Sequence, residues 1–169
     1  STYLTGAELK LAAEVVVGVA PRLADSFFLQ VSGMRFEHDP ARPVFDMVTA
    51  LYLGDEETGY SETPLDTAKD NDALYHVSVN LYLAEMLGVL KTFSGGILSI
   101  KLKDKDGNVL EDPHDALLDT DPDTPGVQEL KLWRTLYEYL ASFPVDEATG
   151  LPKVPARYKT SQERMKLAQ

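Results

Sequence analysis

The chain has 169 residues, of which 44% are hydrophobic and 25% charged, so one globular domain over residues 1–169 is expected. Its formal net charge of -11 argues against the basic stripe that neutralises nucleic-acid phosphates, so no nucleic-acid partner is expected. The lack of cysteine excludes disulfides and thiolate chemistry, and no apolar run approaches the roughly 20 residues that span a bilayer.

The first predicted element is a helix over 5–20. Thr5 and Glu8 have the spacing of a capping box. In such a box the Thr5 hydroxyl accepts a hydrogen bond from the backbone N–H of Glu8, and the Glu8 carboxylate accepts one from the backbone N–H of Thr5. Apolar residues then recur at three- and four-residue spacing, which predicts one core-facing stripe that ends near Pro21. The stripe consists of Leu9, Ala12, Ala13, Val16, Val19 and Ala20.

The second predicted element is a strand over 27–36, reading FFLQVSGMRF. One of its faces carries Phe27, Leu29 and Val31, which alternate with the intervening residues as a half-buried strand requires. Gly33 interrupts the run, and a bulge or a close approach of another backbone is expected there.

Further extended runs are predicted at 44–53, 74–80 and 97–111, where apolar and polar residues alternate. The last run turns at the Asp-Gly pair 106–107, which is typical of a hairpin. The acidic segment 54–72 separates the first two runs and is expected to be a surface loop.

Two more helices complete the pattern. One spans 81–91, and the longest spans 126–143, with Thr124 as the expected N-cap and Pro125 at the first helical position. The remaining tail, 145–169, is punctuated by proline and then polar. These elements predict an α+β fold, in which a mixed or mostly antiparallel sheet has helices packed on it.

The residues indicate no catalytic centre. Two-metal phosphoesterases hold their ions with clustered Asp, His and Asn ligands, whereas His38, His76 and His114 each stand alone in the sequence. No glycine-rich phosphate loop and no Gly-x-Ser-x-Gly elbow occurs. We therefore expect no catalytic residue, metal site or cofactor in this chain.

Calcium binding stays open as an alternative. Asp119, Asp121 and Asp123 have the alternate spacing that begins an EF-hand loop. Thr124 stands where that loop requires glycine, and Leu130 stands where it requires glutamate. Under this alternative the chain would be a calcium-stabilised extracellular domain.

Two phrases resemble a known protein family. Residues 28–33, FLQVSG, and residues 5–9, TGAEL, are similar to phrases in the C-terminal, substrate-recognising domains of the 5'-nucleotidase and UDP-sugar hydrolase family. The resemblance covers residues 3 to about 90, roughly half of the chain. It implies the α+β fold of those domains.

The resemblance also implies a candidate binding site. In the family, an aromatic ring near the start of a motif resembling N-x-F-L-A-x-G-G-D-G-Y stacks on the nucleobase. Residues 80–84, NLYLA, occupy the corresponding place, so Asn80 and Tyr82 are the expected substrate-binding residues. Residues 85–89 replace the glycines and the aspartate of the motif, and its polar partner is therefore missing.

For the whole protein, the resemblance implies that substrate recognition and catalysis belong to different domains. The divalent metal pair and the catalysis would belong to an N-terminal metallophosphoesterase domain, while this chain would recognise a nucleotide or nucleoside without hydrolysing it. The chain starts four residues before Thr5, so the first part of the family domain is expected to be missing. A periplasmic or extracellular location is also implied.

The altered glycine motif leaves a second function open. A domain can keep its fold after it has lost nucleotide binding. Such a chain would be a diverged structural or protein-interaction module.

Overall fold

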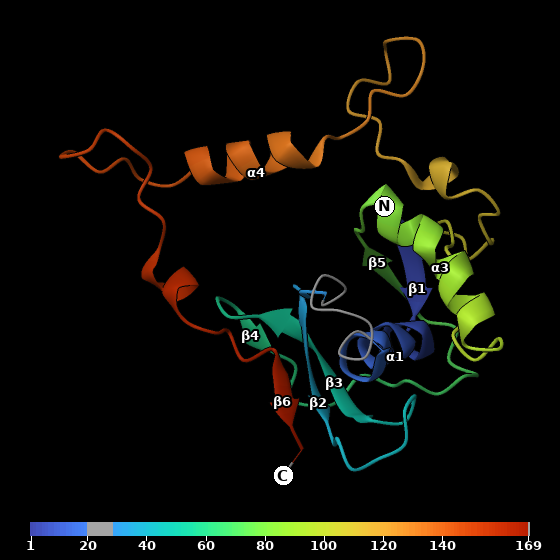
Figure 1. Ribbon diagram of the computed structural model, residues 1–169. Helices are drawn as coiled ribbons and strands as arrows, with labels where there is room; N and C mark the ends of the chain where they lie inside the picture. The colour runs from blue at the N-terminus through green and yellow to red at the C-terminus, as the bar shows by residue number, and fades with distance from the viewer. Residues whose placement is uncertain (20–28, 169) are drawn as a thin grey trace.

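Two small sheets and three α-helices make up the part of the chain that the computed structural model describes, residues 1–19 and 29–168 (Figure 1). One sheet has the strand order β1-β5 and the other the order β4-β3-β2-β6. The predicted α+β class is therefore confirmed. Within the same residues, no helix has both the length and the apolar character needed to cross a membrane.

A short strand that the sequence did not reveal precedes the first helix. β1 (Thr2–Thr5) pairs antiparallel with β5 (Leu74–Val77), which lies within the predicted run 74–80. α1 (Gly6–Glu14) follows β1 without a loop. A Cβ on Gly6 would lie 2.2 Å from the carbonyl oxygen of Asp66, so only glycine lets that segment pass the start of the helix.

The predicted capping box of α1 is present. Thr5 Oγ1 accepts a hydrogen bond from Glu8 N at 3.3 Å, and Glu8 Oε2 accepts one from Thr5 N at 2.8 Å. A π-helical turn, η1 (Val15–Val19), extends the helix. The predicted end near Pro21 lies outside the described residues. The local pattern thus located the start of the helix correctly.

β2 (Met34–His38) lies inside the larger sheet. It pairs antiparallel with β3 (Val48–Asp55), which in turn pairs with the two-residue strand β4 (Gly59–Tyr60). On its other side β2 pairs in parallel with β6 (Met165–Leu167). The interpretation of 145–169 as a polar tail is therefore wrong for β6, because these residues form one edge of the sheet.

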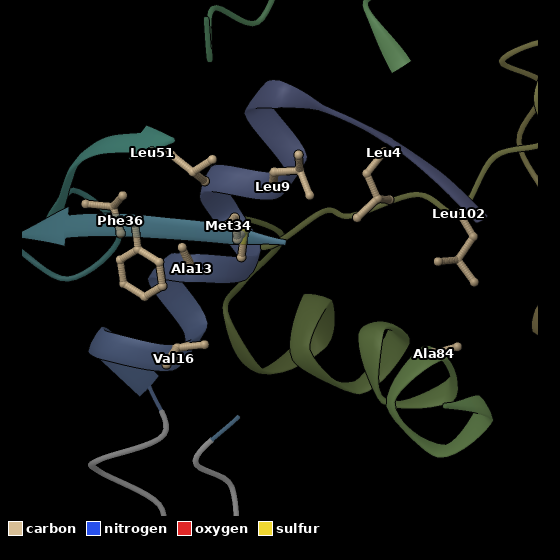
Figure 2. Packing of buried hydrophobic residues seen from close by; sticks show 10 residues of the cluster. Leu4, Leu9, Ala13, Val16, Met34, Phe36, Leu51, Ala84 and Leu102 are labelled. Atoms are coloured by element: carbon tan, nitrogen blue, oxygen red, sulfur yellow. The ribbon is translucent and has the colours of Figure 1, made fainter. Parts of the chain in front are cut away.

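The apolar stripe of α1 shares one core with the larger sheet. Leu9, Ala13 and Val16 belong to the same buried cluster as Phe36 and Leu51 (Figure 2). The side chains of Phe36 and Leu51 are 0% and 1% exposed. The same cluster reaches Leu4 in β1, Ala84 in the next helix and Leu102, so it joins the two sheets.

The predicted strand over 27–36 is wrong in its first part. Residues 29–32 form no strand, β2 begins at Met34, and residues 27 and 28 lie outside the described part. Gly33 explains this start, because its φ of 78° breaks the extended run. Similarly, β3 begins four residues later than the predicted 44, since Phe45 has a φ of 71° in the turn before it.

The predicted run 97–111 belongs to neither sheet. Lys103 forms isolated bridges with Tyr3 and Val109, and the predicted turn is present, with Asp104 N donating to Asn108 O at 2.9 Å. Leu98 and Leu102 are buried. The alternation therefore reflects packing of an extended segment against the core without a continuous hydrogen-bonded ladder.

α4 (Leu132–Ala141) begins later than the predicted helix over 126–143. Residues 118–130 instead form a closed loop, in which Thr120 N donates to Gln128 O at 2.8 Å and Leu130 N donates to Leu118 O at 3.1 Å. Because the loop uses these backbone groups, Thr124 does not cap a helix. The N-cap is Lys131, which makes no capping hydrogen bond with its side chain.

Arg164 joins the C-terminal segment to the turn between β3 and β4. Its Nε and Nη2 donate to Glu56 at 2.6 and 3.0 Å, and its Nη1 donates to the carbonyl of Val31 at 2.6 Å. A hydrogen bond from Arg164 and a smaller contribution from the hydrogen bond of Tyr60 lower the pKa of Glu56 to about 2.

Acid should weaken this attachment. Because the folded chain lowers the pKa of Glu56, its contribution to stability is complete above the ordinary value of 4.5 and is lost as the pH falls toward 2. We expect the urea midpoint of Glu56→Gln to lie below that of the native chain at neutral pH and to approach it as the pH falls. The exposed control Glu62→Gln should follow the native curve. A gap that stays constant with pH would contradict this assignment.

Candidate functional site

A cleft of about 510 Å³ lies where α3 (Leu81–Phe93) begins. Strand β1 and the segments at 113–118 and 129–135 contribute the other walls. The wall is mostly apolar and includes Val79, Leu81, Ala84, Leu102, Leu117 and Leu130. An apolar cleft with a few polar groups is the usual form of a small-molecule site. The helix itself confirms the prediction of a helix over 81–91.

Asn80 lies in the wall of this cleft and starts α3. Its Oδ1 accepts from Leu83 N at 2.8 Å, and its main-chain carbonyl accepts from Ala84 N at 3.1 Å. These are the bonds of an N-cap, so the side chain satisfies a backbone donor in the first turn of the helix. Asn80, which the sequence predicts as a binding residue, therefore has a structural role in starting α3.

Tyr82 is 65% exposed and is not among the residues that line the cleft. Ala84, two positions later, is buried in the core cluster. Positions two apart on a helix are separated by about 200°, so the packing of Ala84 turns Tyr82 outward. The structure thus places Asn80 and Leu81 in the cleft wall. The ring of Tyr82, the next residue, is exposed to solvent.

The residues that replace the glycines of the family motif lie inside α3. Glu85 to Val89 continue the helix, which runs on to Phe93. The backbone therefore makes no glycine turn at this place. Of the described side chains at these helical positions, Glu85 and Val89 are exposed.

A partly buried ion pair that sequence reasoning missed supports the cleft wall. Lys103 Nζ lies 2.5 Å from each carboxylate oxygen of Glu8, and Lys101 N donates to Glu8 Oε1 at 3.1 Å. Burial by itself would raise the pKa of Glu8, but the hydrogen bonds from Lys103, Thr5 and Lys101 together lower it. Because Leu102 lies between the two lysines, the pair fixes this wall residue against α1.

Glu129 and Lys131 bring charge to the cleft wall. Lys131 Nζ lies 2.5 Å from Glu129 Oε2, and this hydrogen bond lowers the pKa of Glu129. The lysine is more than half exposed. An anionic ligand in the cleft would compete with Glu129 for Lys131.

No group of three or more His, Asp or Glu side chains in residues 1–19 and 29–168 is arranged to hold a metal ion. His114 Nδ1 lies 2.8 Å from Asp112 Oδ1, and this hydrogen bond raises the pKa of His114. In the suggested calcium loop, Asp119 Oδ1 accepts from Asp121 N and Gln128 N at 3.0 and 3.1 Å. Asp119 Oδ1 therefore closes this loop by accepting from backbone donors at both of its ends.

Comparison with protein families gives one match. The model described as 5'-nucleotidase, C-terminal domain, matches residues 1–95, which is more than half of the chain. The match includes β1 to β5, α1 and α3, together with Asn80 and Tyr82, and it stops before α4 and β6. A search of curated proteins found no match to the chain.

Proposed function

Because the chain belongs to the family of 5'-nucleotidase C-terminal domains, we propose that it recognises the nucleoside part of a nucleotide for a separate catalytic domain. That partner is an N-terminal metallophosphoesterase domain of the same parent protein, which supplies the divalent metal pair and cleaves the phosphate ester. The chain itself binds the ligand and hydrolyses nothing. The protein works in the periplasm or outside the cell.

The exposed ring of Tyr82 is the observation that carries this proposal. The ring is 65% exposed on the first turn of α3, immediately after the cleft residues Asn80 and Leu81. Stacking of a nucleobase on such a ring contributes roughly 1 to 3 kcal/mol. Lys131 in the cleft wall adds a cation that an anionic ligand can reach.

Truncation of Tyr82 should weaken nucleotide binding. We expect Tyr82→Ala to raise the dissociation constant for AMP roughly 5- to 150-fold, which corresponds to the loss of about 1 to 3 kcal/mol of stacking. Tyr82→Phe is the matched control, because it keeps the ring and should bind within a few-fold of the native chain. Isothermal titration calorimetry or titration of amide proton shifts measures the difference.

Two results would overturn the proposal. One is equal affinity of the native chain and Tyr82→Ala for AMP, and the other is release of phosphate from AMP by the purified chain with added Mn²⁺ or Zn²⁺. Since Tyr82 is exposed, all three proteins should melt at the same temperature, so a change in binding reports the site and not the fold.

The continuous α3 helix favours a second candidate function. A helical backbone through Glu85 to Val89 lacks the glycine turn that carries the aspartate of the family motif. In this case the chain keeps the fold as a structural or interaction module. No binding of AMP to the native chain at millimolar concentration would support this second function over the first.

A further inference from the structure

The cleft at the start of α3 stays open when a base stacks on Tyr82. Ala84 lines the cleft and is buried, whereas Tyr82, two positions earlier, is exposed and does not line it. These side chains point about 200° apart around the helix, so a base on the ring of Tyr82 lies on another side of α3. The cleft, at about 510 Å³, is as large as small-molecule sites usually are. It therefore has room for a ligand of its own.

Much of the cleft wall comes from segments that the family match does not cover. The match ends at residue 95, whereas the segments at 113–118 and 129–135 line the cleft. A backbone bond joins these two segments, because Leu130 N donates to Leu118 O at 3.1 Å. The chemistry of this wall is therefore determined largely by residues outside the matched domain.

The hydroxyl groups in the wall are largely occupied by the protein itself. Thr2 Oγ1 donates to Lys103 O and accepts from Lys103 N, both at 3.0 Å. Thr135 Oγ1 donates to Lys131 O at 3.3 Å, and Asn80 Oδ1 is used by the N-cap of α3. A sugar or another ligand with many hydroxyls would lose hydrogen bonds to water here and regain few of them. The cleft thus disfavours a strongly polar ligand.

Leucine side chains form the accessible apolar part of the wall. Leu118, Leu130 and Leu132 line the cleft and are 40%, 43% and 71% exposed. An apolar ligand would displace water from these side chains, and removal of apolar surface from water is the main favourable term in such binding. The wall therefore favours a ligand with an aliphatic body.

Among the described residues that line the cleft, Lys131 has the only cationic side chain. Its Nζ lies 2.5 Å from Glu129 Oε2, and the two side chains are 55% and 42% exposed. An exposed ion pair contributes little to stability, so a ligand carboxylate can replace Glu129 at small cost. Lys103 is only 14% exposed and is held by both carboxylate oxygens of Glu8. One accessible cation beside an apolar wall is complementary to one anionic group on an apolar body.

We propose that the cleft is a second ligand site, separate from Tyr82, for a small carboxylic acid with an apolar body. The carboxylate pairs with Lys131 in place of Glu129, and the aliphatic chain covers the exposed leucines of the wall. A medium-chain fatty acid such as octanoate has this chemistry. The acid and a nucleotide then bind independently, because they occupy different sides of α3.

The length of the acid is the first test, made on the native chain by isothermal titration calorimetry. Octanoate has four more methylene groups than butanoate, and each buried methylene strengthens binding roughly fourfold, so octanoate should bind at least about tenfold tighter. Octylamine, which has the same chain and the opposite charge, should bind more weakly than octanoate. Equal affinity for the two acids, tighter binding of octylamine, or no binding of millimolar octanoate would overturn the proposal.

A matched pair of leucine variants tests where the chain of the acid lies. Leu130→Gln, in the cleft wall, should weaken octanoate binding about fivefold or more, because it removes apolar contact. Leu136→Gln, at an exposed position that does not line the cleft, should bind octanoate like the native chain. Both side chains are exposed, so both variants should keep the native melting temperature. Equal affinities of the two variants would contradict the assignment to the cleft.

The role of Lys131 is tested by removing its charge. Lys131→Gln should weaken octanoate binding roughly 2- to 10-fold and leave the binding of octan-1-ol unchanged, because only the acid carries a charge. Lys153→Gln, at an exposed position outside the cleft, is the matched control and should bind both ligands like the native chain. An unchanged affinity of Lys131→Gln for octanoate would rule out the proposed ion pair.

Competition with AMP tests whether the two sites are separate. Tyr82→Ala should bind octanoate like the native chain, and saturating AMP should not displace the acid. Displacement of octanoate by AMP would overturn the separate site and assign the cleft to the nucleotide. A chain that binds octanoate and not AMP would contradict the nucleotide proposal and still support this site, so the two failures are distinguishable.

Discussion

Replacing Glu14 by alanine should lower the free energy of unfolding by roughly 3 to 5 kcal/mol, because two buried backbone N–H groups would lose their acceptor. Glu14 is 0% exposed at the end of α1. Its Oε2 accepts from Met47 N at 3.1 Å and its Oε1 accepts from Val48 N at 2.7 Å. These two bonds join the helix to Met47 and to Val48, the first residue of β3, so their loss also loosens the sheet.

Glu14→Gln separates the hydrogen bonds from the bulk of the side chain. The amide of glutamine offers one acceptor oxygen, while its NH₂ group can only donate, so one of the two N–H groups loses its partner. We expect a loss of roughly half that of Glu14→Ala, measured by urea unfolding with circular dichroism. Glu138→Ala, at an exposed position of α4, should leave the midpoint nearly unchanged. A native-like midpoint for Glu14→Ala would show that these bonds do not matter.

The second large effect is expected at Phe36, whose side chain is fully buried in β2. Phe36→Ala should cost about 3 to 5 kcal/mol of unfolding free energy, because it removes the ring and leaves a cavity in the core. Phe36 lies opposite Leu51 of β3 and Met165 of β6 in the strand register. The cavity therefore opens where three strands of the sheet meet the apolar stripe of α1.

Phe36→Leu provides the graded comparison. It keeps most of the buried apolar volume, so the expected cost is about 1 to 2 kcal/mol with an unchanged dependence on denaturant concentration. Phe45→Ala, at a half-buried position in the turn before β3, should cost less than Phe36→Ala. If Phe36→Ala and Phe45→Ala lowered the free energy of unfolding equally, the core would not be centred on Phe36.

The elements that the sequence predicted well are the ones that local interactions determine. The capping box joins Thr5 and Glu8 within one helical turn, and the turn at 104–108 closes over five residues. The helix after Asn80 also starts where the pattern places it. In each case the contacts that stabilise the element lie within about four residues, and the sequence displays them side by side.

The errors lie where distant segments meet. β1 exists because it pairs with residues 74–77, and β6 exists because it pairs with β2 near the other end of the chain. The expected helix start at Thr124 is replaced by a loop whose hydrogen bonds join residues 118–120 to 128–130. Apolar alternation indicated extended backbone in the first and last strand blocks, but it did not determine which residues would pair.

The predictions for the candidate site differ in the same way. Asn80 and Tyr82 were predicted through the family phrase, whereas the partly buried pair of Glu8 and Lys103 was not predicted, because its members are 95 residues apart. Glu14 looked like an ordinary helix residue, although its acceptors are used by backbone donors 33 and 34 residues away. A buried carboxylate has no signature of its own until its donors are known.

By itself the sequence determined the α+β class, the starts of two helices and the resemblance to the 5'-nucleotidase C-terminal domains. The tertiary structure alone decided that Glu14 is buried, that Tyr82 is turned outward by the packing of Ala84, and that the large apolar side chains of α4 are exposed. The physical reason is the range of the interactions. Caps and turns gain their free energy within a few residues, whereas strand pairing and burial require segments that loop closure brings together from distant parts of the chain.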